Sequence, residues 1–263
     1  MSTQQQRQIH YRAAASSISL GVVVGIVVVL ILAILFVHLA REVAENEFAH
    51  FDQTVILKIH ATTSSTQTDV MRVVTDFGSP YLVILALLSL IIGAVVVWRA
   101  RHYERAGILV AVIDAIAPTF TVGSALVLLE LVKAIVNRPR PCTAPHVPCF
   151  FQPLVNETGP SFPSGHVVGA VTFYGMVAYL LLRSPQLHAL VKAGIALLTA
   201  IIVVAIAYSR IYLGVHFPTD VIGSFLLGIA WLLSVAIAMH VMENHLRSAY
   251  TLRQTEEHGG QSP

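Results

Sequence analysis

The sequence has few charged residues. Asp, Glu, Lys and Arg make up 11% of its 263 residues, whereas 56% are hydrophobic and the mean hydropathy is +0.74. Soluble globular domains carry about 25% charged residues, so this composition argues against an ordinary water-soluble domain. The net charge at pH 7 is only +2, and no basic stripe interleaved with aromatic residues is present. Nucleic acid is therefore not an expected partner.

Long apolar segments dominate the chain instead. A helix needs roughly 20 predominantly apolar residues to cross a bilayer. About six segments approach or meet that length: Ile18–Leu39, Tyr81–Trp98, Ala106–Val132, His166–Leu182, Leu190–Tyr208 and Val221–Val241. We predict an all-α, polytopic membrane helix bundle of about six transmembrane helices. Its parts are a cytoplasmic segment over 1–17, a first transmembrane helix with an outer amphipathic loop over 18–80, a core bundle over 81–242 and a cytoplasmic polar tail over 243–263.

The basic residues predict the orientation of this bundle. Nine of the 16 Lys and Arg residues fall on one side of the predicted membrane: Arg7, Arg12, Arg99, Arg101, Arg105, Arg183, Lys192, Arg247 and Arg253. The first loop on the other side is acidic, with Glu42, Glu45, Glu47, Asp52, Asp69 and Asp76. The positive-inside rule then places both termini in the cytoplasm. The predicted location is the inner (plasma) membrane, which the chain crosses several times.

Several features of the spans and loops leave two interpretations open. The first apolar segment is expected to be a retained signal anchor, because it is long for a signal peptide and no clear cleavage site follows; cleavage is the alternative. The loop over 41–80 has apolar residues near helical spacing, including Phe48, Phe51 and Ile56, and predicts an interfacial helix that either packs on the bundle or gates lipid entry. Asp114 is expected to pair with a nearby arginine, Arg99, Arg101 or Arg105, with a functional role as the alternative. Residues 251–263 are expected to be disordered.

The first of three polar segments, K-A-I-V-N-R-P-R-P over 133–141, supplies cations at the outer face. Lys133 alone would be interpreted as a solvated lysine, paired with Glu130 or unpaired. With Arg140 and Arg210 expected at the same face, an anion between the three cations would remove their repulsion. Prolines on both sides of Arg140 favour an extended segment, and a guanidinium held in this way grips a phosphate with two parallel hydrogen bonds. Arg138 is expected to be solvated.

The second segment, P-S-G-H over 163–166, directly precedes an apolar helix. Ser164 or Gly165 therefore falls at the N-cap, where free N–H groups and the helix dipole favour an anion. Ordinary helix capping is the alternative for Ser164. His166 beside this turn is a candidate proton donor to a leaving group.

The third segment, S-R-I-Y-L-G-V-H-F-P-T-D over 209–220, places a carboxylate four residues after a histidine. Asp220 is expected to hold one imidazole nitrogen of His216, which leaves the other nitrogen free to attack phosphorus. Pro218 is expected to start the last helix, so that His216 lies just before it.

In this order, the patterns K-x6-R-P, P-S-G-H and S-R-x5-H-x3-D resemble the type 2 phosphatidic acid phosphatase family, whose superfamily includes the vanadium haloperoxidases. The resemblance covers about residues 81–241. It implies that Lys133, Arg140, Ser164, Gly165 and Arg210 are phosphate ligands. It also implies that His216 is a nucleophile that forms a phosphohistidine, that Asp220 orients it, and that His166 is the general acid that later activates water.

The resemblance and the residues together predict an integral membrane phosphatase whose active site faces the extracytoplasmic side. Its expected substrate is a lipid phosphate or diphosphate in the bilayer: undecaprenyl diphosphate, phosphatidylglycerol phosphate or phosphatidate. No metal and no cofactor are expected, because the cations supply the charge that phosphoryl transfer needs; the two histidines of H-V-M-E-N-H over 240–245 also lack the i, i+4 spacing of a helical metal site. The alternatives are a lipid phosphotransferase using the same site and a non-enzymatic anion transporter.

Cys142 and Cys149 are the only cysteines, in C-T-A-P-H-V-P-C between the first two motifs. In an oxidising extracytoplasmic space they would form a disulfide that stiffens the loop carrying Arg140. Two free thiols are the alternative.

Overall fold

The computed structural model describes residues 20–99, 105–143, 149, 151 and 153–259, and within these residues the chain folds into eight helices without a strand. The helices are α2 (Leu20–Ala44), α3 (Ala49–His60), α4 (Ser65–Asp76), α5 (Pro80–Arg99), α6 (Arg105–Val136), α7 (Gly165–Leu182), α8 (Ala189–Tyr212) and α9 (Pro218–Gly259). The prediction of an all-α membrane bundle is confirmed.

Five of these helices are long and apolar enough to cross a membrane: α2, α6 over Ile108–Val136, α7, α8 and α9 over Pro218–Tyr250. The remaining predicted span coincides with α5, which has 20 residues but a described apolar part of only Ile84–Val95. Large apolar side chains point outward from the bundle, as Ile135 of α6 and Leu190 of α8 do with 82% and 87% of their surface exposed. A hydrocarbon environment removes the cost of that exposure.

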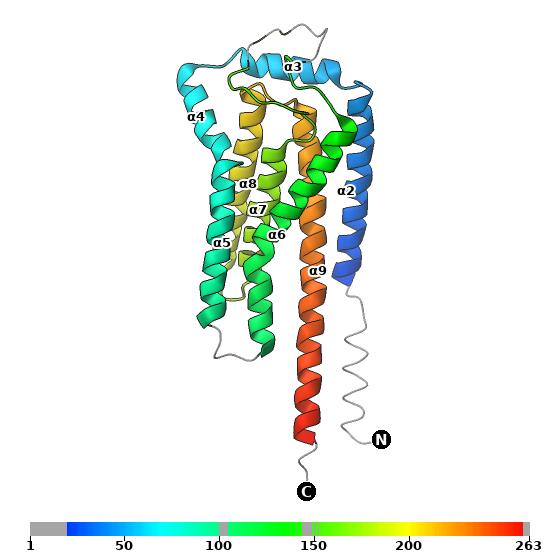
Figure 1. The fold of residues 1–263 in the computed structure, drawn as a ribbon, viewed down its shortest axis with the longest axis vertical. Coiled ribbons are helices and arrows are strands. Elements are labelled where there is room, and N and C mark those ends of the chain that lie inside the picture. The colour runs from blue at the N-terminus through cyan, green and yellow to red at the C-terminus, as the bar shows by residue number, and fades with distance from the viewer. Residues whose placement is uncertain (1–19, 100–104, 144–148, 150, 152, 260–263) are drawn as a thin grey trace.

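The long helices run roughly along one axis, and α3 lies across one end of them (Figure 1). Helix α7 is the centre of the bundle, because it packs against α6, α8 and α9. Nine of its 18 residues are buried. Small residues permit the close contacts between neighbouring helices: a Cβ added to Gly93 of α5 would lie 2.2 Å from the Cβ of Ala115 in α6.

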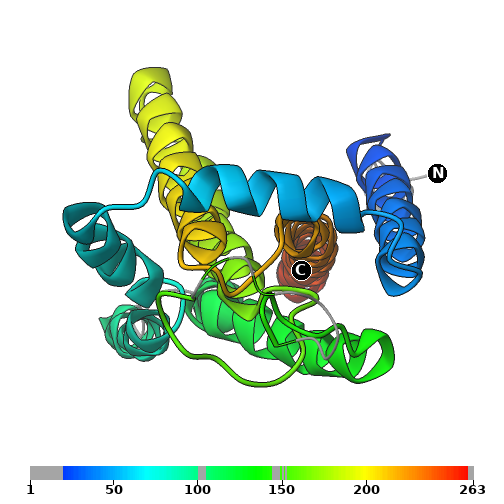
Figure 2. The same cartoon turned by 90° about the horizontal axis from the view of Figure 1, so that it is seen from above.

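The predicted interfacial helix is present as α3, seen from above in Figure 2, where it crosses the ends of α8 and α9. Its Ile56 is buried, Phe48 packs against a core cluster, and Phe51 is 45% exposed. These contacts support the packing interpretation. The helix also buries a charged residue, Asp52, which the sequence did not single out.

Two expectations concern the opposite end of the bundle. Asp114 pairs with Arg183 at the end of α7, and Arg183 also pairs with Glu243 of α9, whereas the side chains of the expected partners Arg99, Arg101 and Arg105 lie outside the described part of the chain. The reason is helix packing, which brings α6, α7 and α9 together here, although the three residues are far apart in sequence. The tail expected to be disordered, 251–263, is helical as far as Gly259 as a continuation of α9.

The predicted orientation remains a prediction. Arg7, Arg12 and Arg101, on which it partly depends, lie outside the described residues, as does the predicted segment 1–17. Helix α2 begins, and α9 ends, at the end of the bundle opposite to α3 (Figure 1). The three polar segments lie at the end that α3 covers.

Candidate active site

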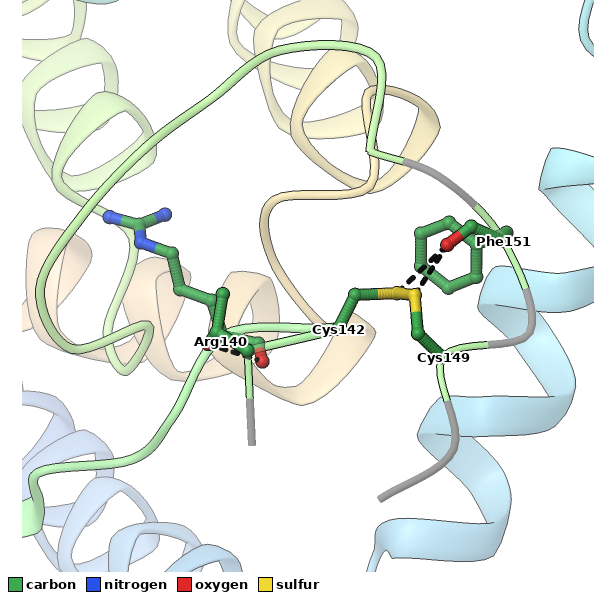
Figure 3. Close-up of a disulfide and its surroundings, with 5 residues drawn as sticks. Arg140, Cys142, Cys149 and Phe151 are labelled. Carbon is green, nitrogen blue, oxygen red and sulfur yellow. Dashed lines mark hydrogen bonds between the residues drawn. A yellow bond between two sulfur atoms is a disulfide. The ribbon is translucent and has the colours of Figure 1, made fainter. Parts of the chain in front are cut away.

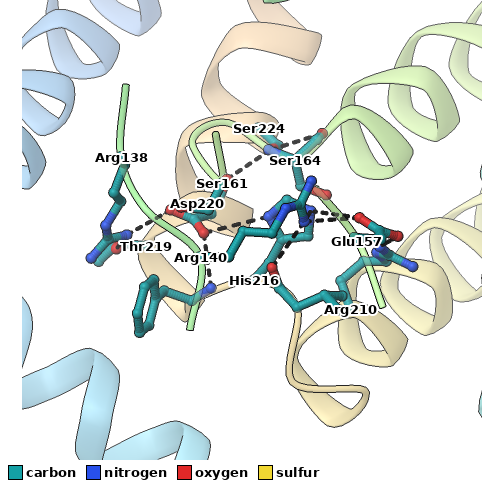
Figure 4. A network of polar contacts seen from close by, with 12 residues as sticks. Arg138, Arg140, Glu157, Ser161, Ser164, Arg210, His216, Thr219, Asp220 and Ser224 are labelled. Carbon is teal, nitrogen blue, oxygen red and sulfur yellow. Dashed lines mark hydrogen bonds and ion pairs between the residues drawn. The ribbon is translucent and has the colours of Figure 1, made fainter. Parts of the chain in front are cut away.

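The polar segments converge at the end of the bundle beneath α3 (Figure 4). Arg140 comes from the loop after α6, Arg210 from the last turn of α8, and His216 from the short connection between α8 and α9. All three side chains are buried, with exposures of 7%, 0% and 1%. Segments separated by about 70 residues in sequence thus place the Arg140 guanidinium in direct contact with the His216 imidazole, and the charge of Arg210 acts on the same imidazole.

His216 and Asp220 are paired as the spacing predicted. Helix α9 begins at Pro218, so His216 lies just before it and Asp220 in its first turn. Nδ1 of His216 lies 3.4 Å from Oδ2 of Asp220, which is longer than an ordinary hydrogen bond, and within the described residues Nδ1 has no closer partner. The same Oδ2 accepts a hydrogen bond of 2.9 Å from the backbone N–H of Phe217. The turn at the start of α9 therefore fixes the carboxylate beside the imidazole.

The other imidazole nitrogen of His216 faces the arginines. Nη1 of Arg140 lies 3.2 Å from Nε2 of His216, and because arginine is only a donor, Nε2 must accept in this contact. That assignment leaves the proton on Nδ1, toward Asp220. Burial lowers the pKa of His216, and the charges of Arg210 and Arg140 lower it further, against the opposing effect of Asp220. His216 is thus neutral near pH 7, with a lone pair on Nε2.

Backbone carbonyl groups hold Arg140 in place. Its Nε donates to the carbonyl of Gly159 at 3.1 Å, and its Nη1 donates to the carbonyl of Val215 at 3.0 Å. Both neighbours of Arg140 are prolines, which keep this segment out of a helix. Arg210 is fixed by a hydrogen bond of 2.5 Å from Nη1 to Oγ1 of Thr75 in α4. Nη1 of Arg140 and Nη2 of Arg210 each make a further contact in the space beside His216.

Glu157, which sequence reasoning missed, occupies that space. Its carboxylate binds Arg210 through Oε1 and lies 2.8 Å from Nη1 of Arg140 through Oε2. Burial alone would raise the pKa of Glu157, but the charge and the hydrogen bond of Arg210, with smaller contributions from His166 and Arg140, lower it to about 2. Because it belongs to no motif, only its place in the loop before P-S-G-H could have suggested it. The two arginines therefore already bind an anionic group of the protein itself, the carboxylate of Glu157.

The P-S-G-H turn contacts α9 through Ser224. Ser164 is the N-cap of α7, but its side chain makes no capping hydrogen bond. Its backbone N–H donates to Oγ of Ser224 at 2.7 Å, and within the described part of the chain its buried Oγ has no partner. A Cβ added to Gly165 would make only an ordinary contact of 3.6 Å with Leu129, so packing does not account for this glycine. Both features favour a ligand at this turn.

The remaining predicted residues differ in how closely they join the site. His166, in the first turn of α7, interacts electrostatically with Glu157. Nζ of Lys133 lies 3.3 Å from Oε1 of Glu130, which is one helical turn earlier on α6. Among the described residues, no ion pair or hydrogen bond joins Lys133 to the other predicted ligands. Its role toward phosphate therefore stays a prediction.

Arg138 contradicts the expectation of a solvated side chain. It is 6% exposed and pairs with two carboxylates, Asp52 of α3 and Asp220 of α9, at 2.6 Å each. The reason is tertiary packing, which brings Asp52 of α3 and Asp220 of α9 to the same guanidinium. Sequence spacing cannot show a contact between residues 86 positions apart.

A disulfide joins Cys142 and Cys149 in the structure, with their Cα atoms 4.6 Å apart (Figure 3). Cys142 follows Arg140 by two residues, so this bridge lies in the loop that carries Arg140. Among the residues that the structure describes, no group of three or more His, Cys, Asp or Glu side chains is arranged to hold a metal ion.

Comparison with known proteins places the chain near membrane phosphatases. The family described as PAP2 superfamily matches residues 114–244. Phosphatidylglycerophosphatase B of Bacillus subtilis is 35% identical over 116 residues, which cover 44% of this chain and 53% of that protein. Undecaprenyl-diphosphatase of Sulfolobus acidocaldarius is 38% identical over 119 residues, covering 43% and 50%. The chain thus spans about half the length of these curated relatives.

A solved structure resembles most of the bundle. The crystal structure of a transmembrane PAP2-type phosphatidylglycerolphosphate phosphatase from Bacillus subtilis matches with a TM-score of 0.65 and 28% identity. The match covers 79% of this chain and 94% of that one. It therefore extends beyond the three motifs to the arrangement of the helices.

Proposed function

Since residues 114–244 form a domain of the PAP2 superfamily, we propose that the protein is an integral membrane phosphatase that removes a terminal phosphate from a lipid monoester or diphosphate. The relatives named above act, by their names, on phosphatidylglycerophosphate and undecaprenyl diphosphate. Phosphatidate is a third candidate of the same chemistry. The helices of this chain form an apolar bundle, and a site at its end suits a substrate that stays in the bilayer.

The observation that carries this proposal is the position of the Glu157 carboxylate. It is held by Arg140 and Arg210, and its Oε2 lies 4.0 Å from Nε2 of His216. A phosphate group bound by the same two guanidinium groups would have its phosphorus beside the lone pair of Nε2. Glu157 must swing away for this to happen, and the two arginines then bind the substrate in its place.

The proposed reaction has two steps. In the first, Nε2 of His216 forms a bond to phosphorus as the bond from phosphorus to the leaving oxygen breaks, and His166 gives its proton to that oxygen. In the second, water attacks phosphorus and gives a proton to His166, the N–P bond breaks, and the electron pair returns to His216. Throughout, Asp220 holds the Nδ1–H of His216.

The charge on the phosphoryl oxygens is balanced by side chains of this protein. Arg140 and Arg210 face it directly, and the free Oγ of Ser164 and the N–H groups at the start of α7 lie at the adjacent turn. Lys133 is the further predicted ligand. We therefore expect turnover without an added divalent metal.

The alternatives use the same site differently. A phosphotransferase would pass the phosphoryl group from His216 to a second lipid rather than to water. An anion transporter would need the arginines, but a buried His216 paired with Asp220 is more than anion binding requires.

The experiment is phosphate release by the detergent-purified protein in EDTA, from undecaprenyl diphosphate, phosphatidylglycerol phosphate, phosphatidate and a soluble sugar phosphate. His216→Ala is compared with His188→Ala, an exposed histidine before α8 at the other end of the bundle. We expect release from a lipid that is lost in His216→Ala and kept in His188→Ala. Release that is equal in the two variants, or that requires magnesium, would refute the proposed mechanism.

A further inference from the structure

We propose that Arg138 is a positioning residue of this site: together with Asp52 it holds the Asp220 carboxylate, and through it His216, in the orientation needed for attack on phosphorus. This inference rests on the proposed function. It concerns residues outside the predicted set of ligands and nucleophile, and it gives α3 a role in the chemistry beyond covering the site.

Arg138 connects the two carboxylates through separate nitrogens. Its Nη1 donates to Oδ1 of Asp220 and its Nη2 to Oδ2 of Asp52, both at 2.6 Å, which is short even for charge-assisted hydrogen bonds. Both aspartates are fully buried. The guanidinium carbon lies 4.2 Å from the centre of the Phe217 ring, so the planar group is also held on one face. Arg138 has one orientation in this site.

Asp52 attaches α3 to the first turn of α9. Its Oδ1 accepts a hydrogen bond of 3.0 Å from the backbone N–H of Thr219, and its Oδ2 accepts one of 2.5 Å from the Thr219 hydroxyl. The first N–H groups of a helix lack partners within it, and an anion is favoured there. Asp52 thus stabilises the helix start that carries Asp220, while it also holds Arg138.

The two oxygens of Asp220 have separate partners as a result. Oδ1 accepts from Arg138, whereas Oδ2 accepts from the Phe217 N–H and faces Nδ1 of His216. Without Arg138, Oδ1 of Asp220 would lose its hydrogen-bond donor, and only the contacts of Oδ2 would hold the carboxylate. Two buried carboxylates, Asp52 and Asp220, would also lose the cation between them, which is costly in a dry site.

Arg138 also has an electrostatic effect that is separable from substrate binding. The charged or titratable groups around the His216–Asp220 pair come from five elements: Asp52 from α3, Arg138 and Arg140 from the loop after α6, Glu157 from the loop before α7, His166 from α7 and Arg210 from α8. Arg140 and Arg210 lie on the Nε2 side, where phosphate would bind. Arg138 is the cation on the Asp220 side. Its removal should let the pair take up a proton at higher pH without changing the anion site.

The chain offers a matched control for a lost bridging arginine. Arg183 pairs with Asp114 and Glu243, at the far end of α7 from the site. Arg183→Gln removes an arginine between two carboxylates, as Arg138→Gln does. A cavity of about 160 Å³ beside Arg138, lined also by Gln53, Pro139 and Phe217, leaves room for water next to a shorter side chain.

The test measures kcat, KM, inhibition by inorganic phosphate and the pH dependence of kcat/KM for the full chain. For Arg138→Gln we expect kcat to fall by about ten- to a hundredfold, the range typical of residues that orient a functional ligand. The acid limb in the pH dependence of kcat/KM should move to higher pH by about one unit. The inhibition constant for phosphate should stay unchanged. Arg138→Lys should restore the position of the limb, because it keeps the charge, but only part of kcat. Arg183→Gln should leave the limb in place.

Asp52→Asn provides a second variant of nearly identical shape, in case Arg138→Gln does not fold. It removes a negative charge near the pair, so the limb should move to lower pH, opposite to Arg138→Gln. A merely structural role would move the limb in neither variant. Wild-type kcat and pH dependence in the Arg138 and Asp52 variants, with His216→Ala inactive, would overturn the positioning role alone. Absence of phosphate release by the wild type would overturn the proposed function and this inference with it.

Discussion

Oε2 of Glu157 lies 4.0 Å from Nε2 of His216, while two arginines hold the same carboxylate. An acidic side chain thus occupies the place that the mechanism assigns to the phosphate of the substrate. With a pKa lowered to about 2, Glu157 stays ionised at every pH at which the protein would work. It must therefore compete with phosphate as a charged group.

Glu157→Gln should strengthen inhibition by inorganic phosphate. The amide keeps the shape of the side chain but loses the charge that attracts both arginines. We expect the inhibition constant for phosphate to fall by about tenfold, which corresponds to about 1.4 kcal/mol. Glu47→Gln, a change of the same charge at an exposed residue before α3, is the control. Weaker inhibition in Glu157→Gln would mean that Glu157 helps to bind the phosphate instead of competing with it.

The pH dependence of kcat/KM should show an acid limb below 6.5, the ordinary pKa of histidine. His216 must be neutral to attack, so activity is lost as pH falls through its pKa. Burial lowers that pKa, and the charges of Arg210 and Arg140 lower it further, so the loss should occur at lower pH than for an exposed histidine. Titration of kcat/KM with a lipid phosphate tests this. An acid limb above 6.5 would show that Asp220 dominates the environment of His216.

Ser164→Ala should lower activity without lowering stability. The Ser164 hydroxyl is buried without a partner in the described part of the chain and does not cap α7 through its side chain. We expect kcat/KM to fall by about tenfold, as when a single hydrogen bond to a charged group is lost, with an unchanged midpoint of thermal unfolding. A lower midpoint with unchanged kcat/KM would assign the hydroxyl to folding.

The Cys142–Cys149 bridge is expected to form in the cell. It lies in the loop of Arg140, so its reduction should lower kcat/KM by loosening that guanidinium. Counting free thiols in the denatured protein, with and without prior reduction, tests the bond itself. The double variant with Cys142→Ser and Cys149→Ser distinguishes loss of the disulfide from other effects of the reductant. Its kcat/KM should not change when reductant is added. Equal thiol counts in the two samples would contradict the expectation.

Local spacing predicted much of the site. Pro218 starts α9 and Asp220 follows His216 by one helical turn, so these residues meet wherever the rest of the chain lies. The apolar segments predicted the membrane helices for the same reason, because length and composition alone fix them. The meeting of Arg140, Arg210 and His216 at one end followed from the alternation of spans across the membrane.

The contacts that were missed all depend on tertiary packing. Arg138 and Glu157 carry no motif, and each has partners more than 50 residues away in sequence. A basic residue between an asparagine and a proline, as Arg138 is, gives no sign that a carboxylate on α3 will pair with it. Asp52 was interpreted as part of an acidic outer loop, because its burial depends on how α3 lies across α9.

The most direct test of the central claim is whether phosphate becomes bound to His216. The protein is mixed with a lipid phosphate labelled in its terminal phosphoryl group and quenched within one turnover. We expect label on the wild-type protein that resists alkali and is released by acid, as a phosphoramidate is, and none on His216→Ala. Turnover without labelled protein at any quench time, or label that persists in His216→Ala, would contradict a phosphohistidine at this residue.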